Sequence, residues 1–103
     1  MKTRAEMQTL LETALGNSNV YFQEPPNTGM KYPCMVYRFV NLDVENANNR
    51  PYKITGRWEI HHMYKNPLKH DLKEKMIFIA PYVSYDSRIV KDGVYNDFYT
   101  IYQ

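Results

Sequence analysis

Histidines, one cysteine and scattered carboxylates are the residues of this chain whose types could do chemistry. His61, His62 and His70 suggest a metal site, because imidazole nitrogens are frequent ligands of transition metals. Adjacent residues of a strand point to opposite faces of a sheet, so His61 and His62 cannot hold one ion together in a regular strand. The spacing therefore predicts no metal site, and it predicts that His62 is partly buried and hydrogen-bonded.

Cys34 is the other candidate, as a nucleophile paired with a histidine. Its apolar neighbours indicate burial in a strand, where a thiol is inert, and a lone cysteine is typical of a protein from a reducing compartment. The carboxylates show no spacing that pairs two of them in a cleft, and the four glycines are isolated rather than gathered in a phosphate-binding loop. The sequence predicts no catalytic residue and no cofactor.

Composition narrows the class of protein further. A chain of 103 residues makes one domain, and its 44% hydrophobic and 15% aromatic residues supply one modest core. The net charge of +2 lacks the strongly basic character of a dedicated nucleic-acid binder. The mean hydropathy of −0.62 predicts a protein that does not span a membrane. The N-terminal segment has no continuous apolar stretch, so we expect no secretory signal.

The first element expected is a helix over residues 5–15. Thr3 and Glu6 have the spacing of a capping box, and Gly16 is a typical residue just after a helix. Apolar residues then recur at helical spacing on one side: Met7, Leu10, Leu11 and Ala14. This pattern predicts that the helix packs its apolar side on a flat surface such as a sheet.

The middle of the chain predicts strands separated by loops. Residues 20–22 are expected to form a short apolar strand, and the proline-containing segment 24–29 is expected to be an exposed loop. Residues 34–40 are apolar on both sides apart from Arg38, which predicts a strand that is buried on both faces. Residues 43–51 contain three asparagines and one proline, which favour turns, and they predict a loop of about nine residues. Residues 52–64 alternate apolar and polar and predict a half-buried strand.

The last part predicts a second helix and two strands. Asn66 and Pro67 mark the helix start, and apolar residues follow at helical spacing until Pro81 ends it: Leu68, Leu72, Met76 and Ile79. Two strands, 82–88 and 94–102, flank an Asp92-Gly93 turn. The predicted fold class is α+β, with two amphipathic helices packed on a mainly antiparallel sheet in the order α-β-β-β-α-β-β.

The long polar segment 43–51 is the main functional feature of the sequence. Loops of this length in a small domain are frequently contact surfaces, although a merely solvated loop explains it as well. Small domains also bury a limited share of their surface and gain stability from partners. The two observations together indicate a protein that functions by assembly.

Several stretches, in their order and spacing, resemble the tail-terminator (tail-completion) proteins of long-tailed bacteriophages and prophages. The stretches are VYFQEPP, KYPCMVY, NANNRPY, PYVSYDSR and YNDFYTIYQ, and with the opening helix they span nearly the whole chain. The resemblance implies a virion protein without catalytic residues, assembled in the bacterial cytoplasm and located at the head–tail interface. It would form a ring, expected to be a hexamer, that caps the tail tube, joins it to the head-connector proteins and lets DNA pass through its channel.

On this resemblance, the subunit or tail-tube interface includes Asn48, Asn49, Arg50 and Tyr52. Two other interpretations stay open from the sequence. One is a head-completion or stopper component of the same junction, which shares size and charge balance. The other is a small nucleic-acid-binding module, which the net charge of +2 does not favour.

Overall fold

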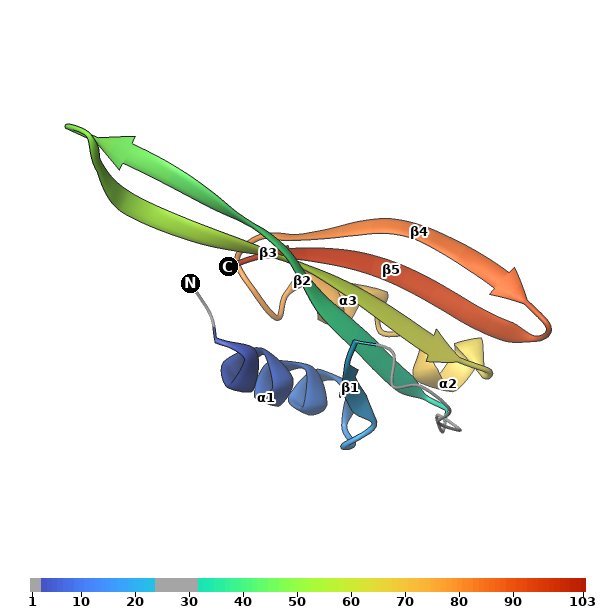
Figure 1. Cartoon of the computed structure of the whole chain (residues 1–103). Helices are drawn as coiled ribbons and strands as arrows, with labels where there is room; N and C mark the ends of the chain where they lie inside the picture. Colours follow the sequence, from blue (N-terminus) through green and yellow to red (C-terminus); the bar gives the residue numbers. More distant parts are fainter. Residues whose placement is uncertain (1–2, 24–31) are drawn as a thin grey trace.

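A twisted β-sheet with helices on one face makes up the part of the chain that the computed structural model describes, residues 3–23 and 32–103 (Figure 1). The strand order is β1-β2-β3-β5-β4, with β1 parallel to β2 and the other neighbours antiparallel. The predicted loop at 24–29 lies outside the described residues. The elements are α1 (Arg4–Leu15), β1 (Val20–Phe22), β2 (Cys34–Ala47), β3 (Arg50–Tyr64), α2 (Pro67–His70), α3 (Lys73–Ile77), β4 (Val83–Lys91) and β5 (Val94–Tyr102). The predicted α+β class and the mainly antiparallel sheet are confirmed.

Helix α1 has the ends that its sequence predicts. The Glu6 N–H donates to the Thr3 hydroxyl at 3.2 Å, and the Thr3 N–H donates to the Glu6 carboxylate at 3.0 Å, which completes the capping box. Gly16 follows the helix with a φ of 83°, in the left-handed region that glycine adopts most easily. Met7, Leu11 and Ala14 are buried, so α1 covers the sheet with the predicted side.

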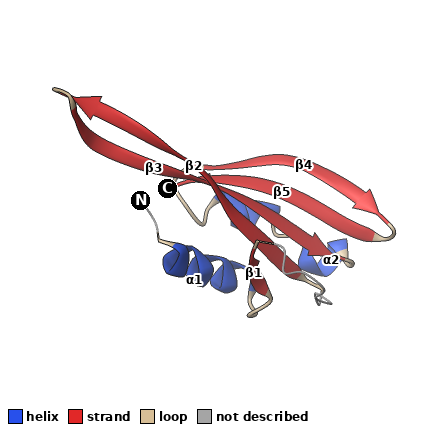
Figure 2. Ribbon diagram, viewed as in Figure 1, coloured by secondary structure: helices blue, strands red, loops and turns tan. Residues whose placement is uncertain are grey.

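Alternation along the strands separates a helix-facing side of the sheet from an open side. In Figure 2 the helices, drawn in blue, lie below the red sheet. The helix-facing side chains form the main core with α1 and with Met76 of α3: Met35, Tyr37, Trp58, Ile60, Tyr99 and Ile101. The open side has a smaller cluster of Cys34, Val36 and Met63. The sheet therefore has a core on one side and a largely polar, solvent-facing surface on the other.

The prediction that residues 34–40 are buried on both faces is wrong for the second half of that segment. Cys34 to Tyr37 are buried, whereas Arg38 is exposed and Phe39 and Val40 are each 37% exposed. The reason is that β1 pairs with β2 only from Met35 to Tyr37. Beyond Tyr37, β2 leaves the covered part of the sheet.

The predicted second helix is also wrong in its extent, because the structure has two short helices in its place. Asn66 caps α2 as expected, its side chain accepting a hydrogen bond from the Leu68 N–H at 3.1 Å. The helix is interrupted at Asp71, whose backbone is extended. The Asp71 carboxylate accepts hydrogen bonds from the Lys73 N–H and from the Arg88 guanidinium, and these hold the chain in the non-helical conformation. The element order is therefore α-β-β-β-α-α-β-β, and Leu68, which is 98% exposed, does not belong to the apolar face.

The predicted loop at 43–51 is instead part of a long hairpin. Strands β2 and β3 pair from Cys34 and Met63 to Ala47 and Arg50, with bulges near Val40 and Asn46. The asparagines and the proline fit because Asn48 and Asn49 form the turn of the hairpin and Pro51 lies beside a bulge, where the ladder is irregular. Residues 41–56 extend beyond the other strands and are named the arm below (Figure 1). The arm makes the molecule elongated, 52 Å along its longest axis against 29 and 23 Å across.

Candidate assembly surface

The arm ends in a two-residue turn at Asn48 and Asn49. Their φ angles are 53° and 64°, so both lie in the left-handed region, as the favoured two-residue hairpin turn requires. Asparagine adopts this region more readily than most other residues with a side chain. Three of the four predicted interface residues, Asn48, Asn49 and Arg50, therefore lie together and exposed at the arm tip. Tyr52 lies nearby in β3, and its side chain is outside the described part of the structure.

The arm has one apolar and one polar side. The pairing places Val44 opposite Ile54 and Leu42 opposite Gly56 on the side that continues the helix-facing surface. The intervening pairs on the other side are polar: Asp43 with Thr55, and Glu45 with Lys53. Leu42, Val44 and Ile54 are each 46% exposed, because the helices do not extend under the arm. A contiguous row of half-exposed aliphatic side chains is typical of a surface that binds another protein.

Sequence reasoning did not single out Leu42 and Val44 as exposed apolar residues on one side of a strand. The signal was present, because Leu42 and Val44 alternate with Asn41, Asp43 and Glu45 with the period of a strand. The asparagines and Pro51 favoured a loop, and alternation between two faces is not expected in a loop. Val44 belongs to the predicted segment 43–51, whereas Leu42 and Ile54, on the same side of the arm, lie outside it.

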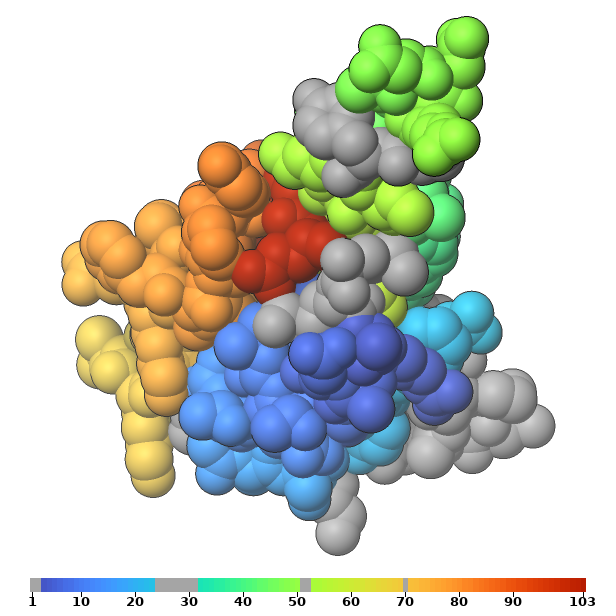
Figure 3. Space-filling view, turned by 90° about the vertical axis from the view of Figure 1, so that its left-hand side faces the viewer, coloured from blue at the N-terminus to red at the C-terminus, as the bar shows by residue number. Residues whose placement is uncertain are grey.

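A second exposed apolar surface lies where α3 leads into β4. A hollow of about 580 Å³ there is lined by Ile77, Phe78, Ile79, Ala80, Pro81 and Val83. Phe78 is 86% exposed and the neighbouring Tyr82 is 65% exposed. We name this surface the α3–β4 hollow. Figure 3 shows the side of the molecule that carries the arm, with the chain from the 70s into the 80s in yellow to orange, α1 in blue and the arm in green at the top.

The base of the arm and the α3–β4 hollow adjoin each other in one subunit. A further depression is lined by Ile54 and neighbouring arm residues together with Glu6 of α1, Pro81, Tyr82 and the C-terminal Gln103. Pro81 therefore borders both depressions, so the apolar side of the arm continues through Ile54 and Tyr82 towards Phe78. The chain thus has two exposed apolar surfaces, the arm and the α3–β4 hollow, joined by a depression whose lining also includes the polar residues Glu6, Lys53, Thr55 and Gln103.

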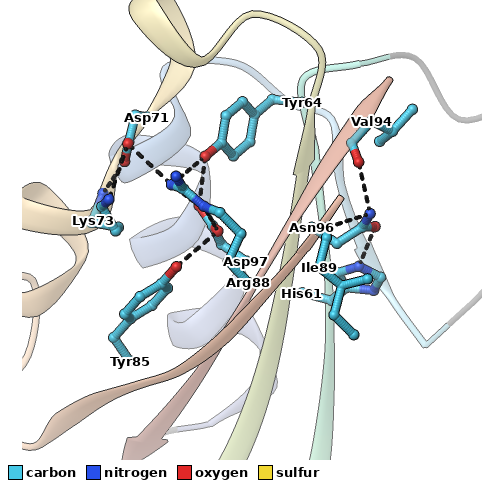
Figure 4. Close-up of polar contacts among 10 residues, drawn as sticks. All are labelled: His61, Tyr64, Asp71, Lys73, Tyr85, Arg88, Ile89, Val94, Asn96 and Asp97. Atoms are coloured by element: carbon cyan, nitrogen blue, oxygen red, sulfur yellow. Dashed lines mark hydrogen bonds and ion pairs between the residues drawn. The ribbon is translucent and has the colours of Figure 1, made fainter. Parts of the chain in front are cut away.

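A buried polar cluster lies on the helix-facing side of the sheet, away from the arm (Figure 4). Asp97 is fully buried and accepts hydrogen bonds from Arg88 Nε at 2.7 Å, from the Tyr64 hydroxyl at 2.7 Å and from the Tyr85 hydroxyl at 3.1 Å. Arg88 Nη2 also donates to Asp71 at 3.1 Å. The cluster therefore ties β4, β5 and the end of β3 to the link between α2 and α3.

The charges of this cluster are balanced within the chain. Burial would raise the pKa of Asp97, but hydrogen bonds from Arg88, Tyr64 and Tyr85 outweigh it and hold that pKa below its ordinary value. Burial and the neighbouring Asp97 raise the pKa of Tyr64, so its hydroxyl stays protonated and donates. A carboxylate with three donors in place is suited to holding the fold together, and the arrangement does not favour proton transfer to a substrate.

The histidine and cysteine candidates lie in separate places. His61 Nε2 lies 2.8 Å from the Asn96 side-chain oxygen and its ring stacks on Phe98 on the open side, whereas His62 is buried on the other side against the Tyr64 ring. His70 has a side chain outside the described residues. Within the described residues, no group of three or more His, Cys, Asp or Glu side chains is placed to hold a metal ion. Burial raises the pKa of Cys34 to about 11, which keeps its thiol protonated.

The open side of the sheet carries a groove of about 820 Å³. Its lining includes Arg38, Glu59, His61 and Phe98, with Asp86 and Ser87 of β4. Arg38 donates two hydrogen bonds to Glu59, so the opposite charges of this groove are paired within the subunit. The groove is lined by both polar and apolar side chains, among them Val36, Phe39 and Ile60, and it carries both acidic and basic groups, unlike the α3–β4 hollow.

Comparisons with protein-family models, with curated proteins and with solved structures found no match to this chain. In the part of the chain that the structure describes, the helices are too short or too polar to cross a membrane. The fold and the geometry of the arm, the hollow and the buried cluster are therefore the basis for an inference about function.

Proposed function

We propose that the protein is a structural virion subunit that assembles as an oligomeric ring, caps the completed tail tube of a long-tailed phage and joins it to the head connector. The observation that supports this proposal is the arm, whose residues Leu42, Val44 and Ile54 are exposed on one side. A small domain that extends an apolar hairpin away from its core is built to contact another protein. The family resemblance of the sequence supplies the identity of the assembly.

The shape of the chain suits a closed ring. A ring of identical subunits needs two different surfaces on each subunit, and ring closure prevents growth into a filament. The arm extends about 23 Å beyond the sheet, taking seven residues of β3 at about 3.3 Å each. This reach is enough to cross from one small subunit onto the next. The net charge of +2 also suits a conduit for DNA, since a strongly basic channel would retain the phosphates.

The buried cluster supports assembly rather than catalysis as the mode of action. Asp97 and Arg88 engage each other, and Tyr64 and Tyr85 complete the hydrogen bonding of the carboxylate. The side chains that most resemble an acid–base site are therefore occupied in linking secondary-structure elements. We propose no enzymatic activity, no cofactor, and as partners the tail-tube protein and the connector.

The test is a measurement of mass followed by a binding assay. Light scattering from low to high micromolar protein, with negative-stain images of the large species, is expected to show rings of about six subunits. Co-sedimentation with tail tubes, purified without this protein from a phage that encodes it, is expected to deposit rings at one tube end. Asp43→Asn, at an exposed position on the polar side of the arm, serves as the control that keeps both properties.

Two results would contradict the proposal. Binding to DNA-filled heads and not to tubes would assign the protein to the head-completion or stopper class. Salt-sensitive binding to DNA in a gel shift, with no binding to tubes or heads, would instead support a nucleic-acid-binding module. Each result replaces the tail-terminator assignment with a different one.

A further inference from the structure

We infer that Asp71 is a hinge between α2 and α3, and that Arg88 of β4 holds this hinge in a bent form. When the Asp71 carboxylate leaves Arg88, residues 67–77 become one continuous helix. The change alters the surface that this part of the chain presents, so the hinge is a conformational switch between two forms of the subunit. The inference goes beyond the proposed function and does not depend on it.

The break between the two helices is confined to Asp71 and Leu72. Asp71 has a φ of −75° and a ψ of 115°, and only its ψ lies far from that of a helix, about −42°. Leu72 has a φ of −112° and a ψ of 15°, which is a smaller departure. The residues on both sides, 67–70 and 73–77, are already helical. A rotation at Asp71 with a smaller adjustment at Leu72 therefore joins the two helices.

The sequence of this segment favours the continuous helix. Its N-cap is Asn66, and residues 68–80 contain no glycine or proline. Leu68, Leu72 and Met76 recur every four residues, which places them on one face of a straight helix. In the bent form Met76 is buried and Leu72 packs against the main core, whereas Leu68 is 98% exposed. Straightening therefore turns Leu68 towards the face that packs on the sheet.

Two hydrogen bonds to the Asp71 carboxylate hold the bent form (Figure 4). Arg88 Nη2 donates to Asp71 Oδ2 at 3.1 Å, and the Lys73 N–H donates to Asp71 Oδ1 at 3.1 Å. In a straight helix the Lys73 N–H binds the carbonyl oxygen four residues earlier instead. When the contact with Asp71 opens, Arg88 keeps its ion pair with Asp97 and its hydrogen bond to the Tyr64 hydroxyl. The hinge can therefore open without leaving the guanidinium unpaired.

The interactions that favour the bent form are weak. The side chains of Asp71 and Arg88 are 29% and 28% exposed, so water screens their ion pair. Helix α2 has only four residues, too few to be stable by itself, and it gains hydrogen bonds when it joins α3. Met76 anchors α3, whereas Lys65 and Asn66, which link α2 to β3, are exposed, so α2 is the part that moves. A partner that binds one form more tightly shifts the subunit towards that form.

A double-mutant cycle with NMR tests the hinge. In Asp71→Ala the Cα chemical shift of residue 71 is expected to become helical, and the amides of Leu72 and Lys73 are expected to become protected from exchange. Leu68→Ala alone should leave the melting temperature unchanged, because the side chain is exposed. In the Asp71→Ala chain the same change should lower it by about 5 °C, because Leu68 then packs. Lys69→Ala, at the next exposed position of α2, is the control and should behave alike in both chains.

Other results overturn the inference. If residue 71 stayed extended in Asp71→Ala, the packing of α2 and not the contact with Arg88 would set the bend. Helical shifts at residue 71 with no change in the effect of Leu68→Ala would show only the higher helix propensity of alanine. If Asp71→Ala failed to fold, Asp71→Asn, which keeps the size and removes the charge, would be measured in its place. Unfolding of both variants would show that the contact supports the fold and cannot open.

Discussion

Arg88 of β4 and Asp97 of β5 lie opposite each other on the helix-facing side of the sheet, joined by a hydrogen bond of 2.7 Å from Nε to Oδ1. This pairing depends on the bulge after Tyr85. The register aligns Tyr85 with Tyr99 and then Arg88 with Asp97, so β4 uses one residue more than β5 between these pairs. In a regular ladder Ser87 would oppose Asp97 and the buried carboxylate would lack its guanidinium.

Replacement of Asp97 is expected to destabilise the fold strongly. Asp97→Asn keeps the shape but removes the charge that Arg88, Tyr64 and Tyr85 surround. Removing one partner of a buried ion pair costs on the order of 3 kcal/mol in the free energy of unfolding. Urea denaturation should show this loss, whereas Asp86→Asn on the exposed side of β4 should change less. Equal stabilities of Asp97→Asn and the unmodified protein would contradict a supporting role for the cluster.

The same cluster predicts a loss of stability in acid. In the folded protein the pKa values of Asp97 and Asp71 lie below their ordinary values, because the hydrogen bonds outweigh the effect of burial. A depressed pKa in the folded state contributes stability that is present above the unfolded pKa, near 3.9, and that is lost as the pH falls towards the folded pKa. Thermal unfolding followed from pH 7 to pH 2.5 should show the melting temperature falling mainly below about pH 4. In Asp97→Asn this fall should be smaller.

Local and non-local interactions explain how much of the fold could be predicted. The capping box of Thr3 and Glu6, the strand at 20–22 and the Asp92-Gly93 turn depend on neighbouring residues and were predicted correctly. The break at Asp71 depends on Arg88, seventeen residues later and on another element, so helical spacing alone could not show it. The same holds for Asp97, whose partner is set by a bulge that no local pattern indicates.

The candidate surface was predicted in position but not in character. Residues 43–51 were expected to make contacts as a loop, and the structure makes them one end of a hairpin with an apolar side. Whether Val44 faces the same way as Ile54 depends on the register between the strands, which is set by the two-residue turn at the tip together with the bulge between Asn46 and Glu45. The α3–β4 hollow could not be predicted, because it arises where the expected helix stops short.

Truncation of the apolar side of the arm should weaken assembly without affecting the fold. Leu42→Ala combined with Val44→Ala removes exposed side chains that contact little within the subunit. Each buried CH₂ is worth about 0.8 kcal/mol, so the loss of the docked groups should weaken association by about tenfold or more. Light scattering across a concentration series measures the change, and circular dichroism should show nearly the same melting temperature. Asp43→Asn, exposed on the polar side of the arm, should assemble normally, and equal weakening by both variants would contradict an apolar contact.

The tip turn offers a variant that should gain stability. Asn49 has a φ of 64°, which glycine adopts without the cost that a side chain incurs, and Asn-Gly is the preferred sequence for this turn. Asn49→Gly should therefore stabilise the arm by about 0.5 kcal/mol, while Asn49→Val should destabilise it more. Amide hydrogen exchange of arm residues is the suitable measurement, because the arm lies outside the core. Faster exchange in Asn49→Gly than in the unmodified protein would argue against the turn.

Cys34 should remain unreactive until the protein unfolds. The side chain is fully buried, and burial raises its pKa to about 11, so at pH 8 the thiol is almost entirely protonated. A thiol reagent such as Ellman's reagent should give no signal with the native protein and one equivalent in concentrated guanidinium. A Ser87→Cys variant provides an exposed thiol as the control. Rapid labelling of native Cys34 would show that the strand end opens readily.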